Sequence, residues 1–178
     1  MAATTAATRG VTLVLVTLSL TACASHRAPA VASQAENQAA FEYLRDLEGP
    51  WVVDGGAEGT FGWEFDITSK GGVILERLKV GTPTEMTTVY HLEDSALVAS
   101  HFCQLGNQPR LLAVDSQADG DLHFDCDGDV GSAESHNELH MHGVHFKKQG
   151  DSVRIWMDMV KDGEIAFETS YTLVRASP

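Results

Sequence analysis

Residues 61 to 80 read FGWEFDITSKGGVILERLKV, and their pattern indicates the fold class. Apolar side chains occupy every second position from Phe61 to Ile67, the period that places them on one face of a β-strand. Ser-Lys-Gly-Gly at residues 69–72 has the composition of a turn, and the apolar, β-branched segment Val73–Val80 follows it. The stretch therefore predicts a β-hairpin.

The same pattern continues along the chain, where segments rich in Val, Ile, Thr, Phe and Trp alternate with Gly, Asp and Asn about every eight to twelve residues. A strand is expected from Trp51, after one helical turn at Ala39–Leu47. Further strands are expected at Met86–His91, Leu97–Cys103, Leu111–Val114, Leu122–Cys126, Leu139–Phe146, Val153–Val160 and Ile165–Val174. Roughly nine or ten antiparallel strands tend to close on themselves, because closure removes the sheet edges. We therefore predict an all-β fold, an antiparallel up-and-down barrel with a short N-terminal helical turn.

Gly49-Pro50-Trp51, directly after the helical turn, resembles the G-x-W motif of lipocalins and other calycins. In that family the tryptophan closes the barrel floor and packs beneath a basic residue of the last strand, and Arg175 is similarly placed here. The resemblance implies that Trp51 and Arg175 touch through a cation–π contact with a structural role.

A looser resemblance covers the whole domain. Phe41-x-x-Leu44-x-x-Leu47-x-Gly49-x-Trp51, Trp63-Glu64-Phe65 and residues 106–110 (GNQPR) together resemble a set of bacterial lipocalin-like proteins. The chain is shorter than typical lipocalins and lacks their second and third motifs, so the resemblance does not specify a ligand class.

The N-terminus has the pattern of a bacterial lipoprotein signal. Arg9 precedes the apolar run Val11–Leu20, and Leu20-Thr21-Ala22-Cys23 closes it. The run is about half of the roughly 20 residues that a membrane-spanning helix needs. We expect residues 1–22 to be removed, 23–40 to form a lipidated N-terminus and flexible tether, and 41–178 to form the barrel. Cys23 would carry the lipid, and Ala24 in place of Asp suits an outer-membrane anchor facing the periplasm.

The net charge of the chain limits the classes of molecule that it is expected to bind. The formal net charge of −13 repels phosphate backbones, so nucleic acid is not an expected partner. Membrane attachment would depend on the lipid of Cys23, not on a basic patch.

Two pairs of residues suggest a metal site. His101 and Cys103 lie two positions apart on a predicted strand, as do His140 and His142, so each pair shares a face. Four such ligands facing inward would suit zinc or copper, and one axial histidine in an apolar pocket would suit haem. Alternatively, these side chains are polar barrel residues with hydrogen-bonding neighbours. Cys103 and Cys126 either pair as a disulfide or remain free, since sequence does not show their separation.

Other residues suggest a small-molecule site. Asn107, Gln108 and Arg110 occupy a polar loop, and Arg110, if it faces inward, would orient a ligand carboxylate or pair with Glu64, Glu76 or Glu168. Apolar lining is expected from residues that include Trp63, Tyr90 and Trp156. The loop residues equally suit an ordinary tight turn.

Two local motifs are rejected. Residues 136–140 (HNELH) lack the H-E-x-x-H spacing of zinc proteases, and Asp125, Asp127 and Asp129 lack the rest of a calcium loop. The leading hypothesis is a membrane-anchored periplasmic lipoprotein whose barrel binds a small, mainly apolar ligand. The alternatives are a metal or haem protein and, last, a barrel enzyme in which a histidine and a carboxylate perform acid–base chemistry.

Overall fold

The computed structural model describes residues 32–56, 62–114, 121–131 and 137–177. These residues form one helix, a short 3-10 turn and ten strands. In chain order the elements are α1 (Gln34–Arg45), β1 (Gly49–Val53), β2 (Gly62–Thr68), η1 (Ser69–Gly71), β3 (Val73–Val80), β4 (Met86–Glu93), β5 (Ala96–Phe102), β6 (Arg110–Val114), β7 (Asp121–Cys126), β8 (His140–Gln149), β9 (Ser152–Lys161) and β10 (Glu164–Arg175).

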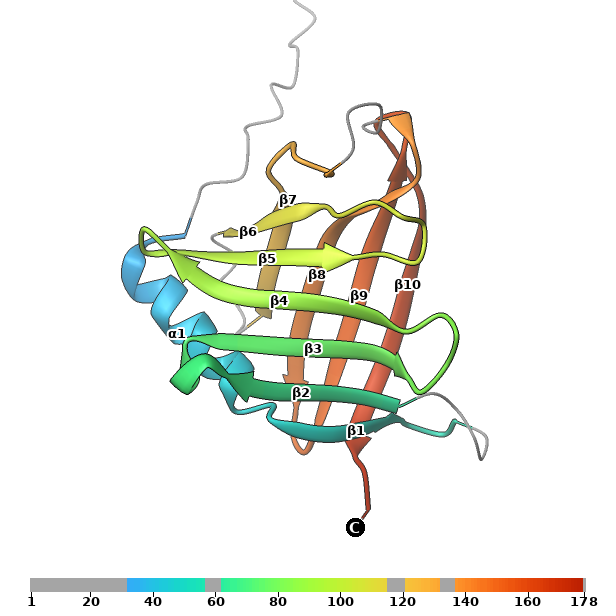
Figure 1. The fold of residues 1–178 in the computed structure, drawn as a ribbon. Helices are drawn as coiled ribbons and strands as arrows, with labels where there is room; N and C mark the ends of the chain where they lie inside the picture. Colours follow the sequence, from blue (N-terminus) through green and yellow to red (C-terminus); the bar gives the residue numbers. More distant parts are fainter. Residues whose placement is uncertain (1–31, 57–61, 115–120, 132–136, 178) are drawn as a thin grey trace, which may run out of the picture.

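The strands form a closed antiparallel barrel in which each strand pairs with its neighbours in sequence, and β1 pairs with β10 to complete the circle (Figure 1). The predicted all-β, up-and-down barrel is therefore confirmed. The hairpin expected at residues 61–80 is β2 and β3, which pair antiparallel from Gly62 opposite Val80 to Thr68 opposite Val73.

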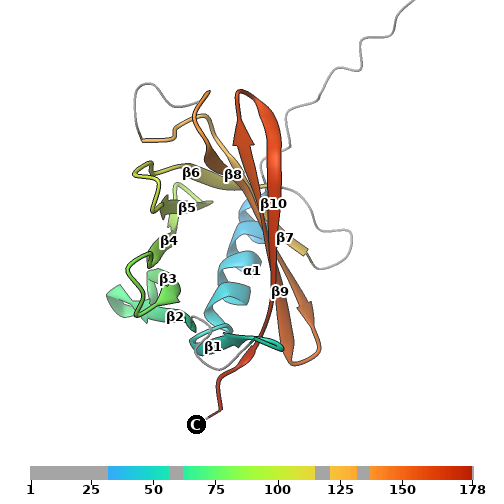
Figure 2. The same ribbon diagram turned by 90° about the vertical axis from the view of Figure 1, so that its right-hand side faces the viewer.

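Helix α1 lies against one end of the barrel, between the sheet formed by β1 to β5 and the strands β7 to β10 (Figure 2). Its side chains Ala40, Phe41 and Leu44 belong to the main hydrophobic core. The connections from β3 to β4 and from β5 to β6 lie at the opposite end, which we call the mouth. The helix thus closes the floor and leaves the mouth for access.

The helix begins at Gln34 rather than at Ala39, so residues 34–40 are not the flexible tether that the sequence predicted. Ser33 and Glu36 form a capping box in which the backbone N–H of Ser33 donates to Glu36 Oε2 over 2.7 Å. Asn37 is buried on the apolar face, where its amide donates to the carbonyl oxygen of Ala32 over 3.0 Å. A polar residue at this position interrupts the apolar period, which is why the sequence pattern does not reveal the first turns.

The predicted signal peptide, its predicted cleavage site and Cys23, the predicted site of lipid attachment, all lie outside the described residues. Within the described part of the chain, α1 is neither long nor apolar enough to cross a bilayer.

The contact implied by the G-x-W resemblance is present. Trp51 pairs with Arg175 across β1 and β10, and the Arg175 guanidinium carbon lies 4.1 Å from the centre of the Trp51 ring. The same guanidinium donates to the carbonyl oxygens of Asp46, at 2.9 Å, and of Glu48. Trp51 donates its indole N–H to the carbonyl oxygen of Leu47 over 2.8 Å. The pair therefore joins the end of α1 to the barrel floor.

Gly49 is expected to be essential to this junction. Its φ is +107°, and a Cβ there would lie 3.3 Å from Arg175 Nη1. Gly81 is a matched control, because its φ is +76° but a Cβ added there would meet no other atom within 4 Å. We expect Gly49→Ala to lower the free energy of unfolding by about 2–3 kcal/mol and Gly81→Ala by about 1 kcal/mol, measured by urea unfolding. Equal losses would show that the Arg175 contact does not constrain Gly49.

Candidate functional site

A cavity of about 160 Å³ opens at the barrel mouth. Four methionines contribute to its wall: Met86, Met141, Met157 and Met159. Two apolar residues at its edge, Leu105 and Phe167, are 50% and 45% exposed. The cavity is therefore mainly apolar, with flexible side chains in its wall.

Two polar ring systems, Trp63 and His101, also line the cavity. The indole N–H of Trp63 donates to Glu76 Oε1 over 2.7 Å, and the hydroxyl of Tyr90 donates to Glu76 Oε2 over 2.5 Å. His101 Nδ1 lies 2.9 Å from the hydroxyl oxygen of Thr88. All five side chains are buried, so a hydrogen-bonded polar network lies beside an apolar cavity.

Burial controls the titration of this network. Burial raises the pKa of Glu76, while hydrogen bonds from Tyr90, Trp63 and Thr88 act in the opposite direction. Burial also raises the pKa of Tyr90 well above its ordinary value, and the charge of Glu76 adds to this effect. Burial lowers the pKa of His101 to about 4. His101 therefore presents a neutral imidazole to the cavity at neutral pH.

Aromatic packing holds the network in place. The Tyr90 ring centre lies 5.4 Å from that of Phe124 and 6.2 Å from that of Phe146. Trp63 packs against Tyr171 with ring centres 5.3 Å apart. Because these rings come from strands around the barrel, the position of the polar network is set by the closed core.

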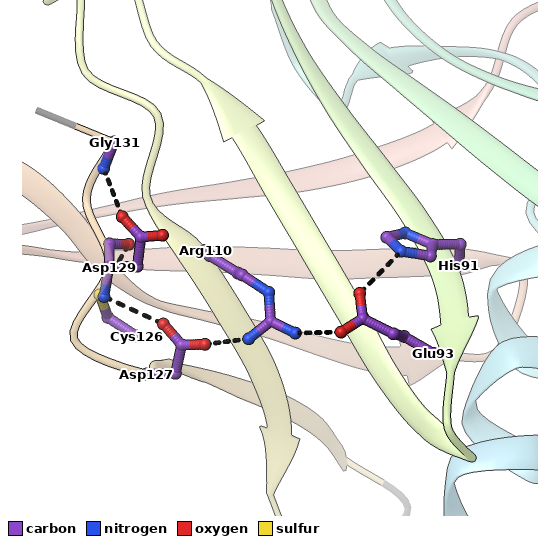
Figure 3. A network of polar contacts seen from close by, with 7 residues as sticks. All are labelled: His91, Glu93, Arg110, Cys126, Asp127, Asp129 and Gly131. Carbon is purple, nitrogen blue, oxygen red and sulfur yellow. Dashed lines mark hydrogen bonds and ion pairs between the residues drawn. The ribbon is translucent and has the colours of Figure 1, made fainter.

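Arg110 does not line the cavity. It alternates with the buried Leu111 on β6, and its guanidinium lies on the outer side between Glu93 and Asp127 (Figure 3). The Nη2–Oε1 distance to Glu93 is 3.1 Å. Neither partner is among the three carboxylates considered from the sequence. Arg110 joins β4, β6 and the turn after β7, and it is not among the residues that line the cavity at the mouth.

The polar network around Arg110 continues beyond both of its carboxylate partners (Figure 3). Glu93 lies 3.6 Å from His91 Nε2, and Asp127 accepts the backbone N–H of Asp129 over 3.0 Å. The acidic turn at residues 127–129 thus organises its own backbone and binds an arginine.

The remaining predicted ligand residues are dispersed. Asn107 is buried and donates its amide to the carbonyl oxygen of Leu139 over 2.9 Å, while Gln108 is exposed and donates to the carbonyl oxygen of Gly106. Trp156 stacks on His145 with ring centres 4.6 Å apart, away from the cavity. Tyr90 does not line the cavity; its hydroxyl donates to Glu76, which also accepts the indole N–H of the cavity residue Trp63. Of the six predicted ligand-binding residues, Trp63 alone lines the cavity.

The predicted metal ligands separate into two groups. His101 and Cys103 both line the cavity, whereas His140 and His142 lie together beside Cys126. His140 Nε2 is 3.4 Å from His142 Nδ1. Cys103 and Cys126 are both free thiols, so the disulfide considered from the sequence is not formed.

Sequence reasoning missed the roles of Glu76 and of two cavity methionines. Glu76 alternates with Ile74 and Leu78 on β3, a pattern that indicates a carboxyl on the buried face. Met86 begins a predicted strand, and Met141 is the third residue of the strand predicted from Leu139. No sequence pattern indicates that Cys126 lies near His140, because the approach depends on the pairing of β7 with β8.

These features define a closed antiparallel barrel, compatible with a lipocalin-like fold, that could bind a small ligand. No protein-family model matches the chain, and no curated protein sequence is significantly similar to it.

Proposed function

We propose that the barrel binds a small, mainly apolar ligand in the cavity at its mouth. The observation that carries the proposal is the combination of an apolar, methionine-rich wall with a few convergent polar groups, the usual form of a small-molecule site. The exposed apolar side chains of Leu105 and Phe167 at the edge favour entry of an apolar molecule.

The cavity volume limits the size of the ligand. An engineered protein cavity of about 150 Å³ binds one benzene ring. The volume of about 160 Å³ here therefore suits one small ring or a short chain, and it is too small for a porphyrin. Methionine side chains are flexible, so the four methionines in the wall can move to enlarge the cavity modestly. The cavity volume therefore favours a small organic ligand over haem.

The polar side chains at the cavity indicate which functional group the ligand carries. The hydroxyl of Thr88 engages His101 Nδ1, which leaves Nε2 as the ring nitrogen available to a ligand. Because the pKa of His101 is lowered to about 4, a neutral hydrogen-bonding partner fits better than a carboxylate that needs a cation. A single ring with one hydroxyl group has this chemistry.

We further propose that the protein is a lipoprotein, and that the lipid on Cys23 anchors it in the outer membrane with the barrel facing the periplasm. The support is the sequence pattern alone, in which Arg9, the apolar run and Leu20-Thr21-Ala22-Cys23 occur in the order of a lipoprotein signal. Two acyl chains on Cys23 would give a stable anchor.

Toluene and p-cresol test the cavity, because they share a ring and differ by one hydroxyl. We expect both to shift the methyl NMR signals of Met86, Met141, Met157 and Met159 in a saturable manner. Thr169→Phe fills the cavity and should weaken both probes at least about tenfold, since the bulky ring takes the ligand volume. Ser170→Phe is the matched control, because Ser170 is the next residue of β10, is exposed and does not line the cavity.

The tighter probe is expected to be p-cresol, through its hydroxyl. Unshifted methyl signals at saturating probe, or equal binding by wild type and Thr169→Phe, would overturn the proposed cavity ligand. Equal loss in both phenylalanine variants would attribute the effect to the strand rather than to the cavity.

A further inference from the structure

A cluster of ligand-type side chains lies apart from the cavity wall. Cys126 ends β7, and His140 and His142 begin β8, the neighbouring strand. One ligand atom from each of these residues lies within 4.8 Å of the other two. We propose that Cys126, His140 and His142 bind a zinc(II) ion and leave its fourth coordination position open.

The donor spacing suits tetrahedral coordination. Two nitrogen ligands about 2.0–2.1 Å from zinc at a tetrahedral angle are about 3.3–3.4 Å apart. His140 Nε2 and His142 Nδ1 are 3.4 Å apart. A thiolate about 2.3 Å from the same ion would lie about 3.6 Å from each nitrogen, within the span of the cluster. Little movement of the histidines is therefore needed.

One histidine is already oriented by its second nitrogen. His140 Nδ1 lies 2.8 Å from the carbonyl oxygen of Glu138, to which it donates its proton. The neutral ring then has its lone pair on Nε2, the nitrogen that faces His142. Hydrogen bonding of the distal ring nitrogen to a carbonyl is the usual way in which proteins orient a histidine ligand.

The strand geometry separates this cluster from the ligand cavity. Met141 lines the cavity, and His140 is its neighbour on β8, so the two side chains lie on opposite faces. The register of β8 against β9 shifts between Met141 and Gly143, which makes His142 the extra residue of a bulge. Bulges re-aim side chains. His140 itself is 1% exposed, so one ligand is held firmly.

The donor chemistry selects the metal class. One thiolate and two imidazoles favour zinc or copper over magnesium or calcium, which prefer oxygen. Asp125 and Asp127 adjoin Cys126 in the sequence, and Asp129 lies three residues away. Arg110 pairs with Asp127, so Asp125 and Asp129 supply the local negative charge that attracts a cation.

The fourth position is accessible. His140 and His142 line a surface groove of about 340 Å³, together with Asn137, Val160, Asp162 and Ile165. Water or another small ligand can approach a bound ion from this groove. Three protein ligands with an open fourth position is the arrangement of zinc sites that bind an exchangeable molecule.

Metal binding to the full chain, purified without chelator, tests the proposal. We expect the cluster to bind one equivalent of zinc. Cys23 is kept in every variant, so any zinc that it binds is the same in all of them. Cobalt(II) should give a thiolate-to-metal charge-transfer band and the visible bands of four-coordinate cobalt. Cys126→Ser, His140→Gln and His142→Gln should each weaken zinc binding at least about tenfold and remove the charge-transfer band or change its shape.

Cys103→Ser is the matched control, because Cys103 is the other free thiol among the described residues and lines the cavity instead. It should keep the wild-type zinc equivalent and cobalt spectrum. Zinc should also raise the Tm of wild type and Cys103→Ser but not of Cys126→Ser. Unchanged zinc binding in Cys126→Ser, loss in Cys103→Ser, or binding of copper without zinc would each overturn the assignment.

Discussion

Replacement of Glu76 with leucine is expected to lower the free energy of unfolding by about 4 kcal/mol, the largest loss among the variants considered. Glu76 accepts the indole N–H of Trp63 and the hydroxyl of Tyr90, and all three side chains are buried. Each buried donor left without an acceptor costs about 1–3 kcal/mol, and leucine leaves two. Urea unfolding at neutral pH measures the difference.

Glu64→Leu is the matched control. Glu64 lies on the adjacent strand β2, is partly exposed and pairs with Arg77 over 2.5 Å. Arg77 keeps Asp66 as a partner at 3.1 Å when Glu64 is removed, so we expect a loss below about 1 kcal/mol. Adding Tyr90→Phe to Glu76→Leu removes one orphaned donor and should recover about 1–2 kcal/mol. A loss in Glu76→Leu no larger than in Glu64→Leu would show that the buried network contributes little to stability.

Acidification is expected to destabilise the protein through His101, by about 3 kcal/mol between pH 6.5 and pH 4. Burial lowers the pKa of His101 from 6.5 to about 4 in the folded state. The unfolded chain therefore binds a proton in this interval that the folded chain does not. This part of the stability is fully present above pH 6.5 and is lost as the pH falls through the folded pKa.

His101→Gln should remove this contribution and flatten the dependence of unfolding free energy on pH. Urea unfolding of wild type and variant at several pH values measures it. Glu76 titrates in the opposite sense, since its pKa is raised, but it is present in both proteins and its effect cancels. His91→Gln is the control at a partly exposed histidine beside Glu93 and should keep most of the wild-type slope. Identical slopes in wild type and His101→Gln would contradict the assigned pKa.

The barrel was predictable because the signals that specify it are local. Alternation from Phe61 to Ile67 and the turn at residues 69–72 specify a hairpin from neighbours in the chain, and each later hairpin repeats this logic. The contact of Trp51 with Arg175 joins the first and last strands of the barrel, yet the G-x-W motif indicated it. The helix was predictable only in part, since the buried polar Asn37 interrupts its apolar face.

The candidate site was much less predictable. Arg110 shows why, because its partners Glu93 and Asp127 each lie 17 residues away and reach it through strand pairing and a turn. Trp156 has the composition of a cavity residue but lies on the outer face, where His145 stacks on it. Composition does not specify the face of a strand when aromatic residues occur on both.

The fold class, the order of the hairpins and the structural pair Trp51 and Arg175 follow from the sequence alone, because they depend on local period, turn chemistry and a short motif. Trp63, Glu76, Tyr90 and His101 meet in one buried network only in the folded barrel, where Cys126 also lies beside His140. Closing the sheet decides which faces meet across the barrel and how strongly each group is desolvated. Distances and burial of this kind are properties of the closed barrel and not of any one strand.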